Sequence, residues 1–158
     1  MIEKNFIVYT GKLNNHEDYL KILSILEEMT DYIELAYEND IVDKFKKDII
    51  YKEHTTRWFS EESYPGANLY RIKASKELFD FLRTYETFCK CFLDPVTGVY
   101  LSVEETDFGI SDIAFYDKEG KSLLETVTHE GDIYIRKDLL GRIKWKYSLY
   151  VVNNFMEK

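Results

Sequence analysis

Residues 120–141, GKSLLETVTHEGDIYIRKDLLG, decide the fold class that we expect of this chain. Two apolar runs, Leu123–Thr128 and Ile133–Arg136, lie between the glycines at the two ends of this stretch and the glycine in its middle. Short runs rich in apolar residues and bounded by turn-forming residues are typical of β-strands. The stretch therefore predicts consecutive antiparallel strands that are joined by tight turns.

The same punctuation continues on both sides of this stretch. Glycines at positions 98, 109, 120, 131 and 141 follow one another at intervals of 11, 11, 11 and 10 residues, which is the rhythm of successive hairpins. Residues 142–152, RIKWKYSLYVV, alternate between polar and apolar with the period of a strand that has one buried face. We predict a five-strand meander with strands at Val99–Glu105, Ile113–Asp117, Leu123–Thr128, Ile133–Arg136 and Arg142–Val152.

The first half of the chain has a helical period instead. After a short expected strand at Asn5–Thr10, apolar residues recur at steps of four and three, which predicts one helix from an N-cap at Asn15 to about Asn39. The apolar stripe of this helix consists of Ile22, Leu26, Met29, Ile33 and Ala36.

Two further helices and a loop complete the expected organisation. One helix is expected from Asp40 to about Lys52, and another begins after Ser75 and ends at the Asp94-Pro95 pair. Residues 54–68 follow neither period and contain a Pro-Gly pair, so we expect a long loop there, followed by a strand at Leu69–Lys73. The fold class is α+β: one domain, residues 1–158, with about three helices packed on one face of an antiparallel sheet.

The composition favours a protein partner over a nucleic acid. The chain has 29 acidic and 21 basic residues and a formal net charge of -8, whereas affinity for nucleic acid comes mainly from lysine and arginine. No apolar stretch approaches the roughly 20 residues of a membrane span. We expect a cytoplasmic protein that binds neither membranes nor nucleic acids.

The sequence contains no recognisable motif for catalysis, metal binding or a cofactor. None of the three histidines has the spacing of a paired metal ligand. The best acid/base candidates are His129, which Glu130 follows, and His54, although charged neighbours at a hairpin tip are usually a solvated turn. The carboxylates Glu104, Glu105 and Asp107 lack the ligand pattern of a calcium loop.

An acidic face on the first expected helix is the first candidate binding surface. Between Glu17 and Asp43 there are nine acidic residues and one basic residue, a formal charge of -8, which equals that of the whole chain. On a helix these carboxylates would lie opposite the apolar stripe and attract a cationic protein. The alternative is an ordinary solvated helix face. The proposed contact residues are Glu27, Asp31, Glu34 and Glu38.

The second candidate surface is the aromatic part of the expected loop. It contains Arg57, Trp58 and Tyr64, and these residue types are enriched among the residues that contribute most to protein interfaces. The alternative is that Trp58 folds back onto the core, as most tryptophans do.

Small size, acidity and the lack of a catalytic motif together favour a non-enzymatic binding protein for a basic protein partner. One concrete form is a bacterial immunity or antitoxin-type protein that masks a cationic toxin domain. The alternative is a small acid/base enzyme that uses His129 or His54, and a structural, oligomer-forming protein is a third reading.

Overall fold

The computed structural model describes residues 6–10, 16–58, 61–88, 91–93, 95–98, 100–102, 112–128, 132–142 and 151–152. The helices are α1 (His16–Met29), α2 (Asp40–Lys44), a 3-10 turn η1 (Lys46–Asp48), α3 (Lys76–Leu82) and α4 (Lys137–Leu140). The strands are β1 (Phe6–Thr10), β2 (Tyr32–Ala36), β3 (Ile49–Trp58), β4 (Glu61–Lys73), β5 (Cys91–Leu93), β6 (Tyr100–Ser102), β7 (Asp112–Tyr116), β8 (Ser122–Val127), β9 (Asp132–Arg136) and β10 (Val151–Val152).

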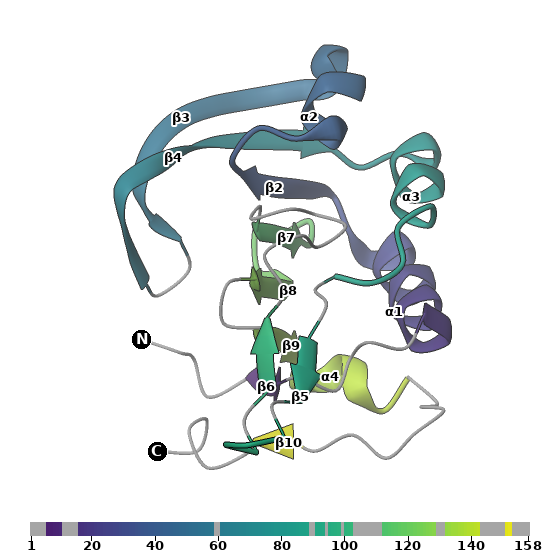
Figure 1. The fold of residues 1–158 in the computed structure, drawn as a ribbon. Coiled ribbons are helices and arrows are strands. Elements are labelled where there is room, and N and C mark those ends of the chain that lie inside the picture. Colours follow the sequence, from purple (N-terminus) through teal and green to yellow (C-terminus); the bar gives the residue numbers. More distant parts are fainter. Residues whose placement is uncertain are drawn as a thin grey trace.

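One antiparallel sheet organises the molecule (Figure 1). Six of its strands follow one another in the order β9-β8-β7-β2-β4-β3, and β1 and β10 continue the sheet beyond β9. Strands β5 and β6 form a separate hairpin. Among the described strands, β3 therefore lies at the end of the sheet, where it pairs with β4.

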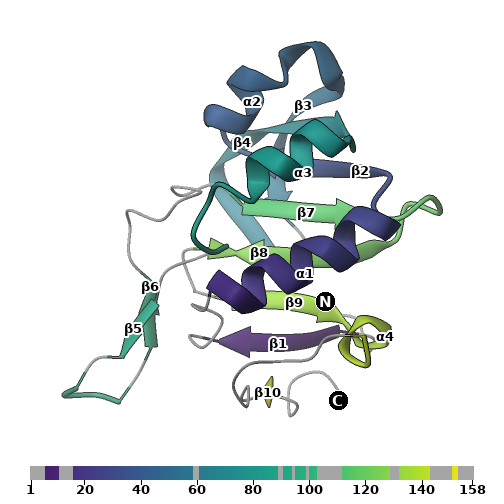
Figure 2. The same ribbon diagram turned by 90° about the vertical axis from the view of Figure 1, so that its right-hand side faces the viewer.

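The helices cover one face of this sheet, and the main core lies between the two layers. In Figure 2, α1 and α3 run in front of the central strands. Tyr19 and Leu26 of α1 and Phe79 of α3 pack with Ile33 of β2 and Phe115 of β7, and all five are at most 1% exposed. Burial of each such side chain contributes about 1.5–3 kcal/mol. The predicted α+β class, with helices and an antiparallel sheet, is confirmed.

The predicted five-strand meander is wrong. Of the five predicted strands, the three that overlap β7, β8 and β9 are consecutive neighbours in the described sheet, with a turn at Gly120, whose φ is +74°. Helix α4 follows β9 directly and has Gly141 as its C-cap, and β1 lies between β9 and β10. Strand β6 pairs with β5 instead of β7. The expected turn glycines at 109 and 131 lie outside the described residues.

The predicted long first helix is also wrong in its second half. Helix α1 ends at Met29, and the chain turns through Thr30 and Asp31 into β2. Four of the five β2 residues are buried: Ile33 and Leu35 belong to the main core, and Ala36 belongs to a second cluster with Ala67, Leu69 and Ala114. A strand buried on both sides is a nearly continuous apolar run, and a short run of that kind cannot be distinguished from a helix by its period.

The prediction of a long loop at residues 54–68 is also wrong. The described residues of this segment belong to the long hairpin of β3 and β4, which bends towards the sheet face opposite the helices (Figure 1). Gly66 lies inside β4 with φ of +92°, a conformation that L-residues with a side chain rarely adopt. The same hairpin replaces the second half of the helix expected at Asp40–Lys52, since α2 ends at Lys44.

Two local predictions are confirmed. The Ser75 side chain accepts a hydrogen bond from the Leu78 N–H and caps α3, although this helix ends at Leu82 instead of reaching Asp94. The strand expected at Leu69–Lys73 lies within β4. Among the described residues, no helix is long and apolar enough to cross a membrane.

Candidate functional site

The sheet face opposite the helices carries a row of tyrosines and carboxylates around one arginine. Cross-strand pairing places Tyr51 and Glu34 on either side of Arg71, and Ala114 separates Glu34 from Glu125. Residues that are directly opposite in antiparallel strands share a face. We name this group the tyrosine–carboxylate face; its members are Tyr32 and Glu34 of β2, Tyr51 and Glu53 of β3, Arg71 of β4, Tyr116 of β7 and Glu125 of β8.

Arg71 is the centre of the tyrosine–carboxylate face. Its Nη2 donates a hydrogen bond of 3.1 Å to Oε1 of Glu34. Its guanidinium lies 4.5 Å from the ring centre of Tyr32 and 5.2 Å from that of Tyr51, so two aromatic rings and one carboxylate hold it. Attraction between a cation and an aromatic ring contributes about 0.5–1 kcal/mol at exposed sites and more where water is excluded.

The inner part of the face is poorly solvated. Glu34 is only 7% exposed, and burial raises the pKa of its carboxyl, although the hydrogen bond to Arg71 and the charge of Arg71 oppose this shift. Burial lowers the pKa of Arg71, but the hydrogen bond to Glu34 and the charge of Glu34 outweigh it, so that the pKa is raised overall. The arginine is therefore held as a cation.

Tyr116 extends the face towards β8. Its ring stacks on that of Tyr32 at 5.0 Å, and its hydroxyl donates a hydrogen bond of 3.4 Å to Oε1 of Glu125, which is 3% exposed. Burial raises the pKa of Tyr116, and the negative charges of Glu125 and Glu34 raise it further. This tyrosine therefore keeps its proton in the folded protein, and its neutral hydroxyl donates the hydrogen bond to the Glu125 carboxylate.

The outer end of the face is open to solvent at the edge of the sheet. Tyr51 is 42% exposed, and its hydroxyl donates a hydrogen bond of 2.6 Å to Oε2 of Glu53, which is also exposed. Aromatic rings and a carboxylate surround the cation of Arg71, and the exposed Tyr51 ring and Glu53 carboxylate present the same two kinds of group at the surface. This arrangement is suited to binding a cationic side chain.

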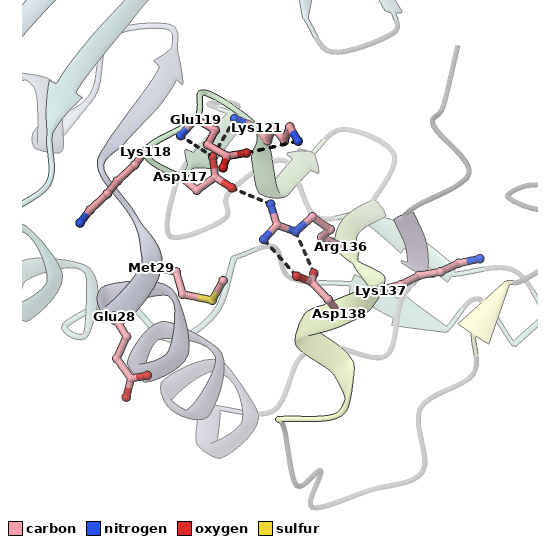
Figure 3. Close-up of a pocket in the computed structure, with 9 residues that line it drawn as sticks. All are labelled: Glu28, Met29, Asp117, Lys118, Glu119, Lys121, Arg136, Lys137 and Asp138. Atoms are coloured by element: carbon pink, nitrogen blue, oxygen red, sulfur yellow. Dashed lines mark hydrogen bonds and ion pairs between the residues drawn. The ribbon is translucent and has the colours of Figure 1, made fainter.

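A separate cavity of about 740 Å³ lies where the end of α1 meets the β7–β8 turn and the start of α4 (Figure 3). Its centre is Arg136, whose Nη1 bonds to Asp117 at 2.8 Å, while Nε and Nη2 bond to Asp138 at 2.8 and 3.1 Å. Lys118 and Lys137 extend away from Arg136 in opposite directions in Figure 3. We interpret the cluster as a structural tie between the turn and α4, because the arginine is already held by two carboxylates.

The four carboxylates of the expected acidic helix face do not lie on one helix. Only Glu27 is on α1, where it pairs with Arg83, the C-cap residue of α3. Asp31 is exposed in the turn that follows, and its backbone bonds to Tyr116 and Ala74. Glu34 lies on the side of the sheet that faces away from the helices, where it is part of the tyrosine–carboxylate face.

The fourth carboxylate, Glu38, follows β2. It is exposed and accepts a hydrogen bond of 2.6 Å from the Tyr70 hydroxyl. The acidic surface that the helical period predicted is therefore divided between a helix, a turn, a strand and a loop.

The aromatic candidates belong to the long hairpin and not to a loop. Arg57 and Trp58 are the last residues of β3, where they pair with Glu62 and Glu61, and Tyr64 lies within β4. The structure describes the backbone of these three candidates and not their side chains, so their proposed contacts stay predictions.

The histidines provide no catalytic constellation within the described residues. His54 is exposed on β3. Nδ1 of His16 lies 2.8 Å from the backbone oxygen of Glu86, and its ring stacks on Tyr19. His129, the other acid/base candidate, lies outside the described residues. In the part of the chain that the structure describes, no group of three or more histidine, cysteine, aspartate or glutamate side chains is placed to hold a metal ion.

Sequence reasoning missed most of the tyrosine–carboxylate face. The sequence did contain a signal for Arg71. In the strand expected at Leu69–Lys73, successive side chains point to alternate faces, so Arg71 lies on the other face of the sheet from Tyr70 and Ile72. Tyr51 and Glu53 gave no such signal, because they fell at the boundary between an expected helix and an expected loop. Their meeting with Glu34 depends on the pairing of β2, β4 and β3.

Comparisons with known proteins give no family for this chain: no protein-family model, no curated protein and no solved structure matches it.

Proposed function

We propose that this chain is a non-enzymatic binding protein that recognises a basic protein through the exposed end of the tyrosine–carboxylate face. The observation that carries the proposal is the internal site of Arg71, where two tyrosine rings and a glutamate hold a guanidinium. Tyr51 belongs both to that site and to the surface, since 42% of it is exposed. A partner's arginine or lysine placed beside Tyr51 and Glu53 would meet the same chemistry.

The charge of the chain supports the same class of partner. A net charge of -8 attracts a basic protein over long distances and raises its association rate at low salt. The carboxylates of α1 are less available for this purpose, since Glu27 pairs with Arg83 and Glu28 with Arg142. We therefore place the proposed contact surface at the edge of the sheet and not on the first helix.

The concrete form of the proposal is an immunity or antitoxin-type protein that covers a cationic surface of a toxin domain. Masking requires little of the binding protein beyond a stable surface of complementary charge and shape, which agrees with the exposed Tyr51–Glu53 pair. Co-expression with candidate basic toxins tests this form directly: the wild-type chain should restore growth, and a chain with Glu53→Arg should not.

A comparative affinity capture tests the proposal as a whole. Immobilised wild-type protein is compared with Glu53→Gln and with Glu77→Gln, which removes one negative charge from an exposed position on α3, on the other face of the sheet. We expect a basic protein that the wild type and the α3 variant retain, and that Glu53→Gln loses.

A second pair of variants separates the ring from the hydroxyl of Tyr51. Tyr51→Phe keeps the aromatic face and should retain the partner, whereas Tyr51→Ala should release it. If wild-type protein and every variant capture the same proteins in the same amounts, the tyrosine–carboxylate face is not a binding surface.

A further inference from the structure

One tyrosine–carboxylate pair of this chain shows how a lysine joins such a pair. The Tyr70 hydroxyl donates a hydrogen bond of 2.6 Å to Oε1 of Glu38, and the ammonium of Lys52 lies 5.1 Å from the centre of the Tyr70 ring. Between these described residues, no ion pair joins Lys52 to Glu38. The lysine therefore lies over the ring without binding the carboxylate.

Arg71 shows how an arginine differs in the same surroundings. Its guanidinium lies 4.5 Å from the centre of the Tyr32 ring and at the same time donates a hydrogen bond of 3.1 Å to Oε1 of Glu34. A guanidinium is planar, so its N–H donors point outward in its own plane while its flat faces stay available for aromatic rings. A lysine ammonium is a compact charge without a flat face. In this protein, arginine therefore combines the ring contact with the carboxylate contact.

The Tyr51–Glu53 pair has the ring and the carboxylate but lacks a cation at the carboxylate. The Tyr51 hydroxyl donates a hydrogen bond of 2.6 Å to Oε2 of Glu53, and Tyr51 is 42% exposed. Arg71 lies 5.2 Å from the centre of the Tyr51 ring, but its hydrogen bond goes to Glu34. In the part of the chain that the structure describes, no cation forms an ion pair with Glu53.

The negative charge of Glu53 acts on the interior of the tyrosine–carboxylate face. Burial raises the pKa of Glu34, the hydrogen bond and the charge of Arg71 oppose this shift, and the charge of Glu53 adds to it. Arg71 and Glu34 together are formally neutral, so a cation placed beside Tyr51 meets the net charge of Glu53. Charge complementarity therefore favours a cationic side chain at this pair.

We propose that the Tyr51–Glu53 pair is an arginine site: an arginine of the basic partner, and not a lysine, lies on the exposed part of the Tyr51 ring and donates hydrogen bonds to Glu53. This inference rests on the proposed function and specifies which side chain of the partner is recognised. Arginine makes both contacts at once, as Arg71 does inside the face. Lysine makes one of them at a time, as Lys52 does over Tyr70.

The experiment measures the binding of fluorescein-labelled peptides to the full chain by fluorescence anisotropy, at an ionic strength of about 0.15 M. The peptides carry cationic residues separated by serine–glycine pairs and differ only in the cation, which is arginine, lysine or asymmetric dimethylarginine. All have the same net charge, so long-range attraction is the same for each. We expect the arginine peptide to bind about two- to fivefold more tightly than the lysine peptide. Dimethylarginine keeps the charge but loses donors, so its peptide should bind more weakly than the arginine peptide.

Protein variants locate this preference at the pair. Tyr51→Phe keeps the ring and should keep the preference for arginine, whereas Tyr51→Leu removes the ring and should bring the two affinities to a ratio of about one. Glu53→Gln should weaken both peptides and remove the difference between arginine and dimethylarginine. The matched control is Glu77→Gln at an exposed position on α3, which should bind as the wild type does. Far-UV circular dichroism checks the fold, and the Glu53→Gln comparison decides the question if Tyr51→Leu unfolds.

The outcomes separate this inference from the proposed function. If the arginine and lysine peptides bind equally and Glu53→Gln weakens both, the face binds cations without selecting arginine, so the inference is overturned and the proposed function stands. A preference for arginine that persists in folded Tyr51→Leu would arise elsewhere on the protein and overturns the inference as well. The same holds if no peptide binds while basic proteins are still captured in a Glu53-dependent way. If neither peptides nor proteins depend on Glu53, both proposals fail.

Discussion

Replacing Arg71 by methionine is the most informative perturbation of the tyrosine–carboxylate face. Methionine keeps an unbranched apolar stem against the rings of Tyr32 and Tyr51 but removes the charge. Glu34 is then left 7% exposed without its cation. The matched change on the other side is Glu34→Gln, which removes the buried charge and keeps a hydrogen-bond acceptor.

The magnitudes follow from the geometry. At the 3.1 Å separation of Nη2 and Oε1, the gross attraction is about 5 kcal/mol for an effective dielectric constant of about 20, and the desolvation of Glu34 offsets most of it. Breaking a fully buried pair costs about 3–5 kcal/mol. Because the Arg71 side chain is 33% exposed, we expect about 2–3 kcal/mol for Arg71→Met at neutral pH and less than about 1 kcal/mol for Glu34→Gln.

The pH dependence of Arg71→Met gives a second test. The pKa of Glu34 is already raised above its ordinary value of 4.5, and loss of the arginine raises it further. A carboxyl whose pKa is raised in the folded state contributes stability that is present below the unfolded pKa and is lost as the pH rises through the folded pKa. The destabilisation relative to wild type should therefore be smallest near pH 4.5 and should grow towards neutral pH.

Urea denaturation followed by circular dichroism at several pH values measures these free energies of unfolding. The control is Arg83→Met, because Arg83 and its partner Glu27 are 28% and 32% exposed, and we expect this change to cost under about 1 kcal/mol with little dependence on pH. The reasoning is refuted if Arg71→Met is destabilised equally at all pH values, or if Glu34→Gln costs more than Arg71→Met.

Three further changes test the fold, each by thermal or urea denaturation. Gly66→Ala should cost more than about 1 kcal/mol, because φ is +92° and a Cβ would collide with the backbone oxygen of Thr55, whereas Gly141→Ala, where nothing lies within 4 Å, should be neutral or slightly stabilising. Asn39→Ala should cost about 1 kcal/mol, since its Oδ1 caps α2; an unchanged midpoint would contradict the cap. Phe79→Ala should cost about 3–5 kcal/mol because the residue is 1% exposed, and a loss below about 1 kcal/mol would place it outside the core.

Local sequence signals predicted those elements whose ends carry their own chemistry. Ser75 caps α3 as expected, because a hydroxyl before an apolar period satisfies the first free N–H groups of a helix. The expected strands at Ile113–Asp117, Leu123–Thr128 and Ile133–Arg136 correspond to β7, β8 and β9, because they are short runs between turns. In these cases the residues that decide the structure are close together in the chain.

The candidate site was harder to predict, because it is made by strands that are distant in sequence. Glu34 was assigned to a helix surface, and its position on the sheet follows from pairing with Arg71, 37 residues later. Tyr51 reaches the same arginine from a third strand. The spacing of the apolar residues around Glu34 is compatible with a helix and with a strand. The two backbones point the Glu34 side chain in different directions, so the sequence did not decide where this carboxylate lies.

The sequence by itself determined the α+β class, the turn at Gly120, the cap of α3 and the acidic balance of the chain, because each depends on composition or on neighbouring residues. Only the tertiary structure decided that β1 inserts between β9 and β10, that residues 32–36 form a central strand, and that β3 is the last of the described strands in the sheet. These features depend on which strands pair, and pairing is selected by the burial of both sheet faces at once. That burial involves residues from the whole chain, so no local pattern specifies it.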